Sequence, residues 1–276
     1  MSAATDLLER QLPTPQPPSA AVDVSDPIPG SEASHDASRI GALDGLRALA
    51  VVMVLVYHLW PRHLPSGFLG VDVFMVLSGF LITGLLVRER DATGRVRFGA
   101  FFGRRFRRLV PAVMLLIATV AVWTSAVGPD SMITSVRSQG LAALGYVANW
   151  RLVLDGTSYG GATGDESPLV HLWSLAVEEQ FYLCWPPLLV LLLALGRGRH
   201  RVAVVAASVG AIASAAVMAM MFEPGGDPLR VYYGTDTRAQ AFLVGAVAAL
   251  AAPHLSVRAR RIVAWLGLVA LAALTV

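Results

Sequence analysis

The sequence has one cysteine, no lysine and few charged residues. The single cysteine, Cys184, excludes an internal disulfide and a metal cluster built on cysteines, and its apolar surroundings favour a role in packing. All 22 basic residues are arginines, which indicates nothing about mechanism. Charged residues make up 15% of the chain and hydrophobic residues 55%. This balance excludes a soluble domain and indicates a membrane protein with several spans.

The start of the chain lacks a basic segment followed by a continuous apolar core, so a secretory signal peptide is not expected. Residues 1–38 contain PTPQPP, several Ser and Ala and scattered acids, without apolar periodicity. They are predicted to form a disordered tail, and the first span after them would serve as the uncleaved insertion signal. No fixed-period repeat and no soluble domain is visible.

Seven apolar segments after the tail predict transmembrane helices: 42–60, 68–87, 109–127, 170–195, 202–222, 237–252 and 262–276. The last segment would give only about 22 Å of helix, which is short of a hydrocarbon core about 30 Å thick. We therefore expect an all-α transmembrane bundle that occupies residues 39–276 and continues into a larger membrane domain.

Arginines crowd three of the connecting loops, and such loops lie on the cytoplasmic side of a membrane. The arginines are Arg88, Arg90, Arg95, Arg97, Arg104, Arg105, Arg107 and Arg108, then Arg197, Arg199 and Arg201, then Arg258, Arg260 and Arg261. With these loops inside, the N-terminal tail is cytoplasmic, His58 lies toward the outer half of the membrane and Arg47 toward the inner half. The segment around 139–154 should then not cross, and we expect an external or re-entrant helix there.

The first apolar segment places an arginine and a histidine, Arg47 and His58, inside one expected span. Eleven residues make about three helical turns, so the two side chains fall on nearly the same stripe, about 16 Å apart along the axis. Ionisable side chains within a span are costly and usually face a wet cavity, which favours a functional pair that serves one elongated ligand. The alternative is that Arg47 snorkels to one interface and His58 is hydrogen-bonded near the other.

The segment GRRFRRLVPA, residues 103–112, places four arginines where a cytoplasmic loop is expected to enter the third span. Guanidinium groups bind phosphate through bidentate hydrogen bonds, so an anion site is one interpretation. Anchoring at the membrane surface through lipid headgroups is the other. Nucleic acid is not an expected partner, because the basic residues are tied to membrane edges.

The segment SPLVHLWSLAVEEQFYL begins with a helix-start signal, a serine cap followed by a proline in the first turn. His171, Ser174 and Glu178 then share one stripe of the helix, with Glu179 and Gln180 turned away from it. A Ser-His-acid catalytic triad is disfavoured, because one helix rarely aims three side chains at a single atom. The stripe is predicted to form a polar wall of a pocket.

Two adjacent glutamates within a span, Glu178 and Glu179, are costly unless at least one meets an arginine or a ligand. Arg47 and Arg238 are the expected partners.

Polar residues also occur in two further spans. GVDVFMVLSGFLIT places Asp72 near the outer end of the second span and Ser78 with Gly79 in its middle, where small residues favour close helix packing. No base adjacent to Ser78 is evident, and the second glycine of a G-x-S-x-G elbow is lacking. YYGTDTRAQAFLVGA supplies Asp236 and Arg238, either as an exposed ion pair at the membrane boundary or as part of a cavity.

These motifs together resemble the membrane acyltransferase family three, whose members are integral-membrane O-acyltransferases that act on bacterial surface glycans and on some sugar-bearing natural products. The resemblance runs from about Arg39 to Gly245, with the motifs in family order. It is carried by Arg47 with His58, GFLGVDVFMVLSGFLIT, RRFRRLVPA, SPLVHLWSLAVEEQFYL and YYGTDTRAQAFLVGA. The family's membrane domain usually has about ten spans, and Met75 stands where a phenylalanine is usual.

The resemblance implies roles for single positions. Arg47 and His58 match the family's paired arginine and essential histidine, and Arg105 and Arg108 match its R-x-x-R element, which is held to bind coenzyme A phosphates. The expected catalytic residues are His58, Arg47, Glu178 and Glu179, the expected donor-binding residues Arg105 and Arg108, and the expected acceptor-binding residues Asp72, His171, Ser174 and Arg238. No metal is expected.

The same resemblance implies a donor, acetyl-coenzyme A or another acyl-coenzyme A, supplied from the cytosol to a protein of the bacterial cytoplasmic membrane. The implied acceptor is a hydroxyl of a glycan, a glycolipid or a glycosylated small molecule. We expect His58, kept neutral by desolvation, to take the acceptor's proton as its oxygen attacks the thioester, and an acyl-histidine intermediate is a less favoured variant. A transporter or flippase that binds an anionic lipid-linked sugar through Arg47, Glu178 and Arg238 is the alternative class. A structural membrane subunit is a third.

Overall fold

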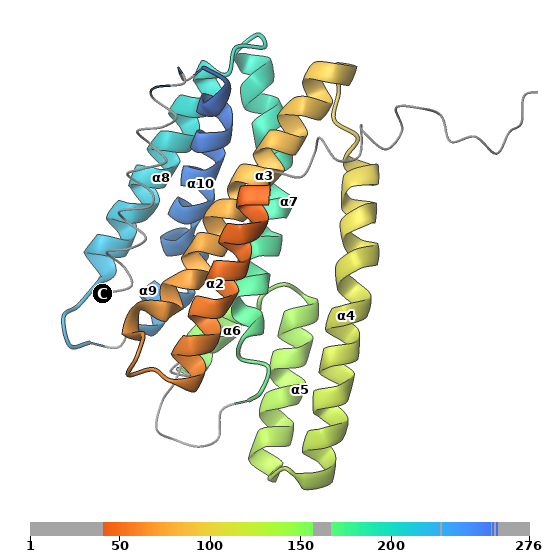
Figure 1. The fold of residues 1–276 in the computed structure, drawn as a ribbon. Helices are drawn as coiled ribbons and strands as arrows, with labels where there is room; N and C mark the ends of the chain where they lie inside the picture. Colours follow the sequence, from red (N-terminus) through yellow and green to blue (C-terminus); the bar gives the residue numbers. More distant parts are fainter. Residues whose placement is uncertain (1–40, 157–166, 227, 255, 257, 259–276) are drawn as a thin grey trace, which may run out of the picture. The chain divides into compact units, whose positions relative to one another are not determined.

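Helices form all of the regular secondary structure in the residues that the computed structural model describes, which are 41–156, 167–226, 228–254, 256 and 258. Residues 42–276 belong to one compact unit, and every contact described below lies within it. The helices are α2 (Gly41–Leu59), η1 (Pro65–Leu69), α3 (Gly70–Thr93), α4 (Phe98–Val127), α5 (Asp130–Leu144), α6 (Ala148–Asp155), α7 (Leu172–Leu195), α8 (Arg201–Met221), α9 (Leu229–Tyr233), α10 (Thr235–Ala251) and η2 (Ala252–His254) (Figure 1).

Four helices of the described part are long and apolar enough to cross a membrane: η1 with α3, α4, α7 and α8. The chain is thus an all-α, multi-pass membrane protein, as predicted. The first and sixth predicted spans are the helices α2 and α10, of 19 and 17 residues, which are not among those four. The predicted tail, 1–38, and the last predicted span, 262–276, lie outside the described residues.

The centre of the bundle is a close crossing of α3 and α10. A Cβ atom on Gly79 would overlap the backbone of Phe242, and one on Gly245 would overlap the backbone of Val76. Only glycine allows two helix backbones to approach this closely, which is how transmembrane helices commonly associate. The structure therefore confirms the packing role predicted for Gly79.

Glycines also position α2, which carries Arg47 and His58. A Cβ atom on Gly67 would collide with α2 at Met53, and one on Gly70 would collide with the backbone of Ala50. The start of α3 can therefore lie directly against α2, so that the polar stripe of α2 has a fixed place in the bundle.

Two of the arginine-rich connections lie at one end of the bundle, at the top of Figure 1, where α3 joins α4 and α7 joins α8, and α10 ends at the same side. Arg260 and Arg261 of the third predicted connection lie outside the described residues. Helices α3 and α7 run in the same direction, as two hydrogen bonds between them show: Ser78 donates to Glu178, and Trp185, further along α7, donates to Thr83, further along α3. The short helices α5 and α6, near the predicted non-crossing segment 139–154, lie toward the other end and are not among the four candidate spans.

Two predicted helix starts were wrong. Helix α4 begins at Phe98, eleven residues before the predicted span, because Gly94 ends α3 with a left-handed φ of 72° and the chain reverses within a short turn. The arginine cluster therefore lies inside a helix rather than in a loop. Helix α7 begins at Leu172, and the predicted cap Ser167 instead accepts the N–H of Leu169 in a preceding turn.

The single cysteine does not have the packing role predicted from its apolar surroundings. Cys184 is exposed on α7. Because α7 is long enough to cross a membrane, an apolar surrounding sequence at this position does not imply burial against other helices.

Candidate functional site

An arginine from α4 binds the two glutamates of α7. Nε of Arg105 donates a 2.6 Å hydrogen bond to Oε1 of Glu179, and its Nη2 lies 3.6 Å from Oε1 of Glu178. The guanidinium also stacks on the ring of Tyr182, with Cζ 3.5 Å from the ring centroid. The sequence analysis expected Arg47 or Arg238 as the partner, and that expectation was wrong. Because the arginine cluster is helical, Arg105 faces α7 instead of remaining in a loop.

A serine from α3 orients the first of these glutamates. Oγ of Ser78 donates a 2.6 Å hydrogen bond to Oε1 of Glu178. Sequence analysis gave Ser78 a packing role and missed this bond. The sequence could have indicated this bond, because a serine and a glutamate in the middle of apolar helices both need a polar partner.

A cavity of about 610 Å³ opens beside this pair, between α2, α3, α4 and α7. Its polar lining residues are Arg47, Arg108, Ser174, Glu178 and Ser78, and the rest of its wall is apolar. Four of these five were predicted site residues, and they come from three helices. Among the described residues, neither of the two arginines has an ion-pair partner. An apolar cavity with two uncompensated guanidinium groups is suited to an anion that also has an apolar part.

A second cavity, of about 480 Å³, lies on the other side of α7 and is lined by Arg105, Glu179 and Tyr182. The two glutamates thus face different cavities, which agrees with the prediction that Glu179 turns away from the stripe of Glu178. Tyr146, from the connection between α5 and α6, also lines this second cavity. Burial and the nearby negative charge of Glu179 raise the pKa of the Tyr146 phenol above its ordinary value.

The histidines His58 and His171 lie beside each other at the end of the bundle opposite the arginine-rich connections. Their ring centroids are 5.2 Å apart. Nδ1 of His58 donates a 2.7 Å hydrogen bond to the carbonyl oxygen of Val54, which also lines the first cavity. A carbonyl can only accept, so in the neutral ring the proton is on Nδ1 and the basic lone pair is on Nε2. The His58 ring is exposed, whereas the sequence analysis expected burial to desolvate it.

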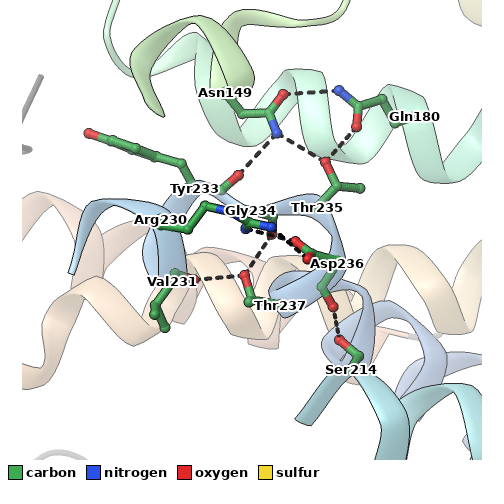
Figure 2. Close-up of polar contacts among 10 residues, drawn as sticks. All are labelled: Asn149, Gln180, Ser214, Arg230, Val231, Tyr233, Gly234, Thr235, Asp236 and Thr237. Atoms are coloured by element: carbon green, nitrogen blue, oxygen red, sulfur yellow. Dashed lines mark hydrogen bonds and ion pairs between the residues drawn. The ribbon is translucent and has the colours of Figure 1, made fainter. Parts of the chain in front are cut away.

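Arg238 is buried and pairs with Asp72. Its Nη1 lies 2.8 Å from Oδ1 of Asp72, and its Nε donates to the carbonyl oxygen of Tyr232. Of the two interpretations left open for Asp236 and Arg238, the ion pair between them was wrong, because Asp236 binds Arg230 through both carboxylate oxygens (Figure 2). Arg238 instead lines a third cavity.

A closed triangle of hydrogen bonds joins α6, α7 and the start of α10 (Figure 2). Asn149 donates to Thr235, Thr235 donates to the side chain of Gln180, and Gln180 donates to Asn149. Asn149 also donates to the carbonyl oxygen of Tyr233, and Gln180 donates to that of Tyr146. Sequence analysis missed this network, although a fully buried asparagine such as Asn149 requires partners.

The structure thus divides the predicted site residues into three groups. Arg47, Arg108, Ser174 and Glu178 share the first cavity, Arg105 and Glu179 lie at the second, and Asp72, Arg238, His58 and His171 lie beyond the first cavity. In the described part of the chain, no group of three or more His, Cys, Asp or Glu side chains could hold a metal ion.

The model of the family described as "Acyltransferase domain" matches residues 40–276 of this chain. The chain belongs to this family of acyl-transferring enzymes. Peptidoglycan O-acetyltransferase OatA of Listeria monocytogenes serovar 1/2a is 41% identical over 214 residues, which are 78% of this chain and 34% of that protein. YrhL of Bacillus subtilis strain 168 is 44% identical over 214 residues, 78% of this chain and 33% of that protein. The chain spans about a third of the length that its matched relatives have. No solved structure matches it.

Proposed function

We propose that this chain is the membrane domain of an O-acyltransferase that moves an acyl group, of which acetyl is the simplest, from cytosolic acyl-coenzyme A to a hydroxyl of a glycan or another sugar-bearing acceptor. The observation that carries the proposal is the first cavity, which Arg47, Arg108 and Glu178 share and which extends to Val54, one helical turn before His58. Family membership supports the acyl transfer, and the name of the Listeria relative, a peptidoglycan O-acetyltransferase, supports a glycan acceptor.

The donor enters at the arginine-rich end. Arg108 contacts a phosphate of coenzyme A and Arg47 contacts another part of the donor, because both guanidinium groups line the cavity without an acidic partner among the described residues. Arg105 is already engaged by Glu178 and Glu179, so it reaches a phosphate only by exchanging one of these contacts. The apolar walls of the cavity hold the pantetheine arm, and its volume is in the range of small-molecule sites.

The thioester then lies near the far end of the cavity, one helical turn from His58. Nε2 of His58 accepts the proton of the acceptor hydroxyl as that oxygen forms a bond to the thioester carbonyl carbon. The bond from carbon to sulfur breaks, and coenzyme A leaves as its thiol with the proton that the histidine carried. The hydrogen bond from Nδ1 to Val54 holds the tautomer that this step requires. This is direct transfer without an acyl-enzyme.

Glu178 and Glu179 act as a fixed counter-charge. Four arginines and two glutamates line the two cavities, which leaves two positive charges for the donor to neutralise. Without the glutamates, the arginines would repel each other and bind any anion. Because Ser78 and Arg105 hold the carboxylates, the glutamates orient the arginines rather than react.

The direction of transfer is part of the proposal. The arginine-rich end lies in the cytoplasm of a bacterium, as does the N-terminus, and the His58 end faces outward. The acceptor is then an extracytoplasmic glycan, of which peptidoglycan is one case suggested by the Listeria relative.

The deciding experiment is binding of radiolabelled acetyl-coenzyme A to the purified protein in detergent, followed by release of coenzyme A when soluble glycan-strand fragments are added. The wild type should bind the donor and release coenzyme A only with acceptor. His58→Ala should bind the donor but transfer acyl groups about 100-fold more slowly or worse. His63→Ala is the matched control, because His63 is an exposed histidine in the turn after α2.

Two results would refute the proposal. Folded protein that binds neither acetyl-coenzyme A nor a longer acyl donor would remove the role of the arginines and favour the transporter alternative. A covalent acyl group trapped on His58 would replace direct transfer by a two-step mechanism.

A further inference from the structure

A third cavity, of about 340 Å³, lies at the His58 end of the bundle and has aromatic walls. Tyr57 from α2, Phe68 from η1 and Tyr232 from α9 line it, and Arg238 lines it from α10. The ring centroids of Tyr57 and Phe68 are 5.9 Å apart, and those of Phe68 and Tyr232 are 6.5 Å apart. All three rings remain partly exposed.

The polar wall of this cavity is held rigidly. Asp72 and the carbonyl oxygen of Tyr232 bind Nη1 and Nε of Arg238, and the guanidinium lies 4.5 Å from the Tyr232 ring centroid. Among the described residues, Nη2 of Arg238 donates no hydrogen bond. Three flat apolar surfaces and one fixed charged donor therefore surround a space of small-molecule size.

This pattern selects for a particular ligand chemistry. A pyranose ring has C–H bonds that pack on aromatic faces, because these faces carry partial negative charge. It also has hydroxyls at its edge that a guanidinium can bind. A lipid acyl chain would fill the aromatic part but would offer no acceptor to Nη2 of Arg238, which costs free energy.

The cavity is also next to the histidine. The ring centroid of Tyr57 is 5.4 Å from that of His58, its neighbour in sequence. A sugar held against Tyr57 therefore places hydroxyls near the imidazole, and Val54, which accepts the hydrogen bond of His58, lines the first cavity.

We infer that the cavity lined by Tyr57, Phe68, Tyr232 and Arg238 is a carbohydrate subsite that holds one sugar ring of the acceptor. Its part in acyl transfer rests on the proposed function, but sugar binding does not. A site of this size accepts one or two rings, so a longer glycan would extend from it into solvent.

Binding alone tests the inference. Saturation-transfer difference NMR, with soluble disaccharide fragments of glycan strands and the purified protein in detergent, measures affinity without any donor. Phe68→Leu keeps the side chain apolar but removes the flat face, and it should weaken binding about three- to tenfold. Phe68→Tyr keeps the face and should bind like the wild type. Trp123→Leu, at an exposed aromatic residue of α4, is the matched control and should also bind like the wild type.

The outcomes separate this inference from the proposed function. Equal affinity of the wild type and Phe68→Leu, or no binding by the folded wild type, overturns the sugar subsite whatever the enzyme does. Displacement of the disaccharide by a short-chain phospholipid but not by other sugars overturns it in favour of a lipid site. If transfer is measurable, Phe68→Leu should raise the KM for the acceptor by the same factor and change the KM for acetyl-coenzyme A by less than twofold.

Discussion

Oγ of Ser78 donates a 2.6 Å hydrogen bond to Oε1 of Glu178 and so ties the middle of α3 to the polar stripe of α7. Both side chains line the first cavity, which is proposed to bind the donor. Nη2 of Arg105, from α4, lies 3.6 Å from the same carboxylate oxygen. A small hydroxyl in an apolar span thus sets the direction of a charge in the site.

Ser78→Ala should lower the rate of acyl transfer about tenfold, because the Glu178 carboxylate loses a partner in a partly buried position. The melting temperature should change little, because the side chain is small. Ser125→Ala is the control, since Ser125 is exposed and bonds only to the backbone of its own helix. Transfer rates of both variants in detergent check the prediction, and an unchanged rate for Ser78→Ala would remove its orienting role.

Arg105→Ala should destabilise the protein by about 3 kcal/mol, because it leaves two glutamates without their counter-ion. The double variant Arg105→Ala with Glu179→Gln should recover part of that loss, since fewer unpaired charges remain. Arg104→Ala, an exposed arginine one position earlier, should be nearly neutral. Denaturant unfolding of the wild type, Arg105→Ala, Glu179→Gln and the double variant measures the coupling, and additive effects would contradict a direct pair.

Arg108→Ala should weaken binding of acetyl-coenzyme A at least tenfold, because a charge-assisted contact to phosphate is lost. Arg104→Ala again serves as the control, because it removes the same charge from the same helix but does not line the donor cavity. Equilibrium binding in low and high salt checks this. Equal losses for both variants would indicate a general charge effect rather than a site.

Gly79→Ala should severely reduce the yield of folded protein, because the added methyl group overlaps the backbone of Phe242. Gly99→Ala is the matched substitution within helix α4, where no atom lies within 4 Å of the added Cβ. It should be neutral or slightly stabilising, since alanine favours the helix by about 0.5–1 kcal/mol. Thermal unfolding and size-exclusion profiles distinguish the two.

The ion pair between Asp236 and Arg230 should make the free energy of unfolding depend on pH in the acid range. The hydrogen bonds from Arg230 hold the pKa of this carboxyl below its ordinary value, against the opposing effect of burial. Between the unfolded and the folded pKa of Asp236, the unfolded chain binds more protons than the folded chain. The stabilisation is therefore present above the unfolded pKa and is lost as the pH falls through the folded pKa. The melting temperature of Asp236→Asn should therefore fall less than that of the wild type between about pH 5 and pH 3, the range around the ordinary pKa of aspartate.

The sequence by itself determined the membrane class, the all-α fold and the family, because apolar segment length and motif order are local properties of the chain. It also identified four of the polar residues that meet in the first cavity, since a charged or polar residue in a span needs a wet or paired environment. It misplaced the start of α4, because an arginine-rich segment has good helix propensity but low hydropathy, and only hydropathy was used there.

Only the tertiary structure decided which charges pair. Glu179 binds Arg105 rather than Arg47 or Arg238, Arg238 binds Asp72, and Asp236 binds Arg230. The first two choices depend on the relative rotation and depth of helices that are far apart in sequence, and the close glycine crossing of α3 and α10 fixes the pair of Arg238 with Asp72. The third joins the consecutive helices α9 and α10, and the turn between them sets it. The aromatic cavity near His58 likewise arises from α2, η1, α9 and α10 together, so no local pattern could have revealed it.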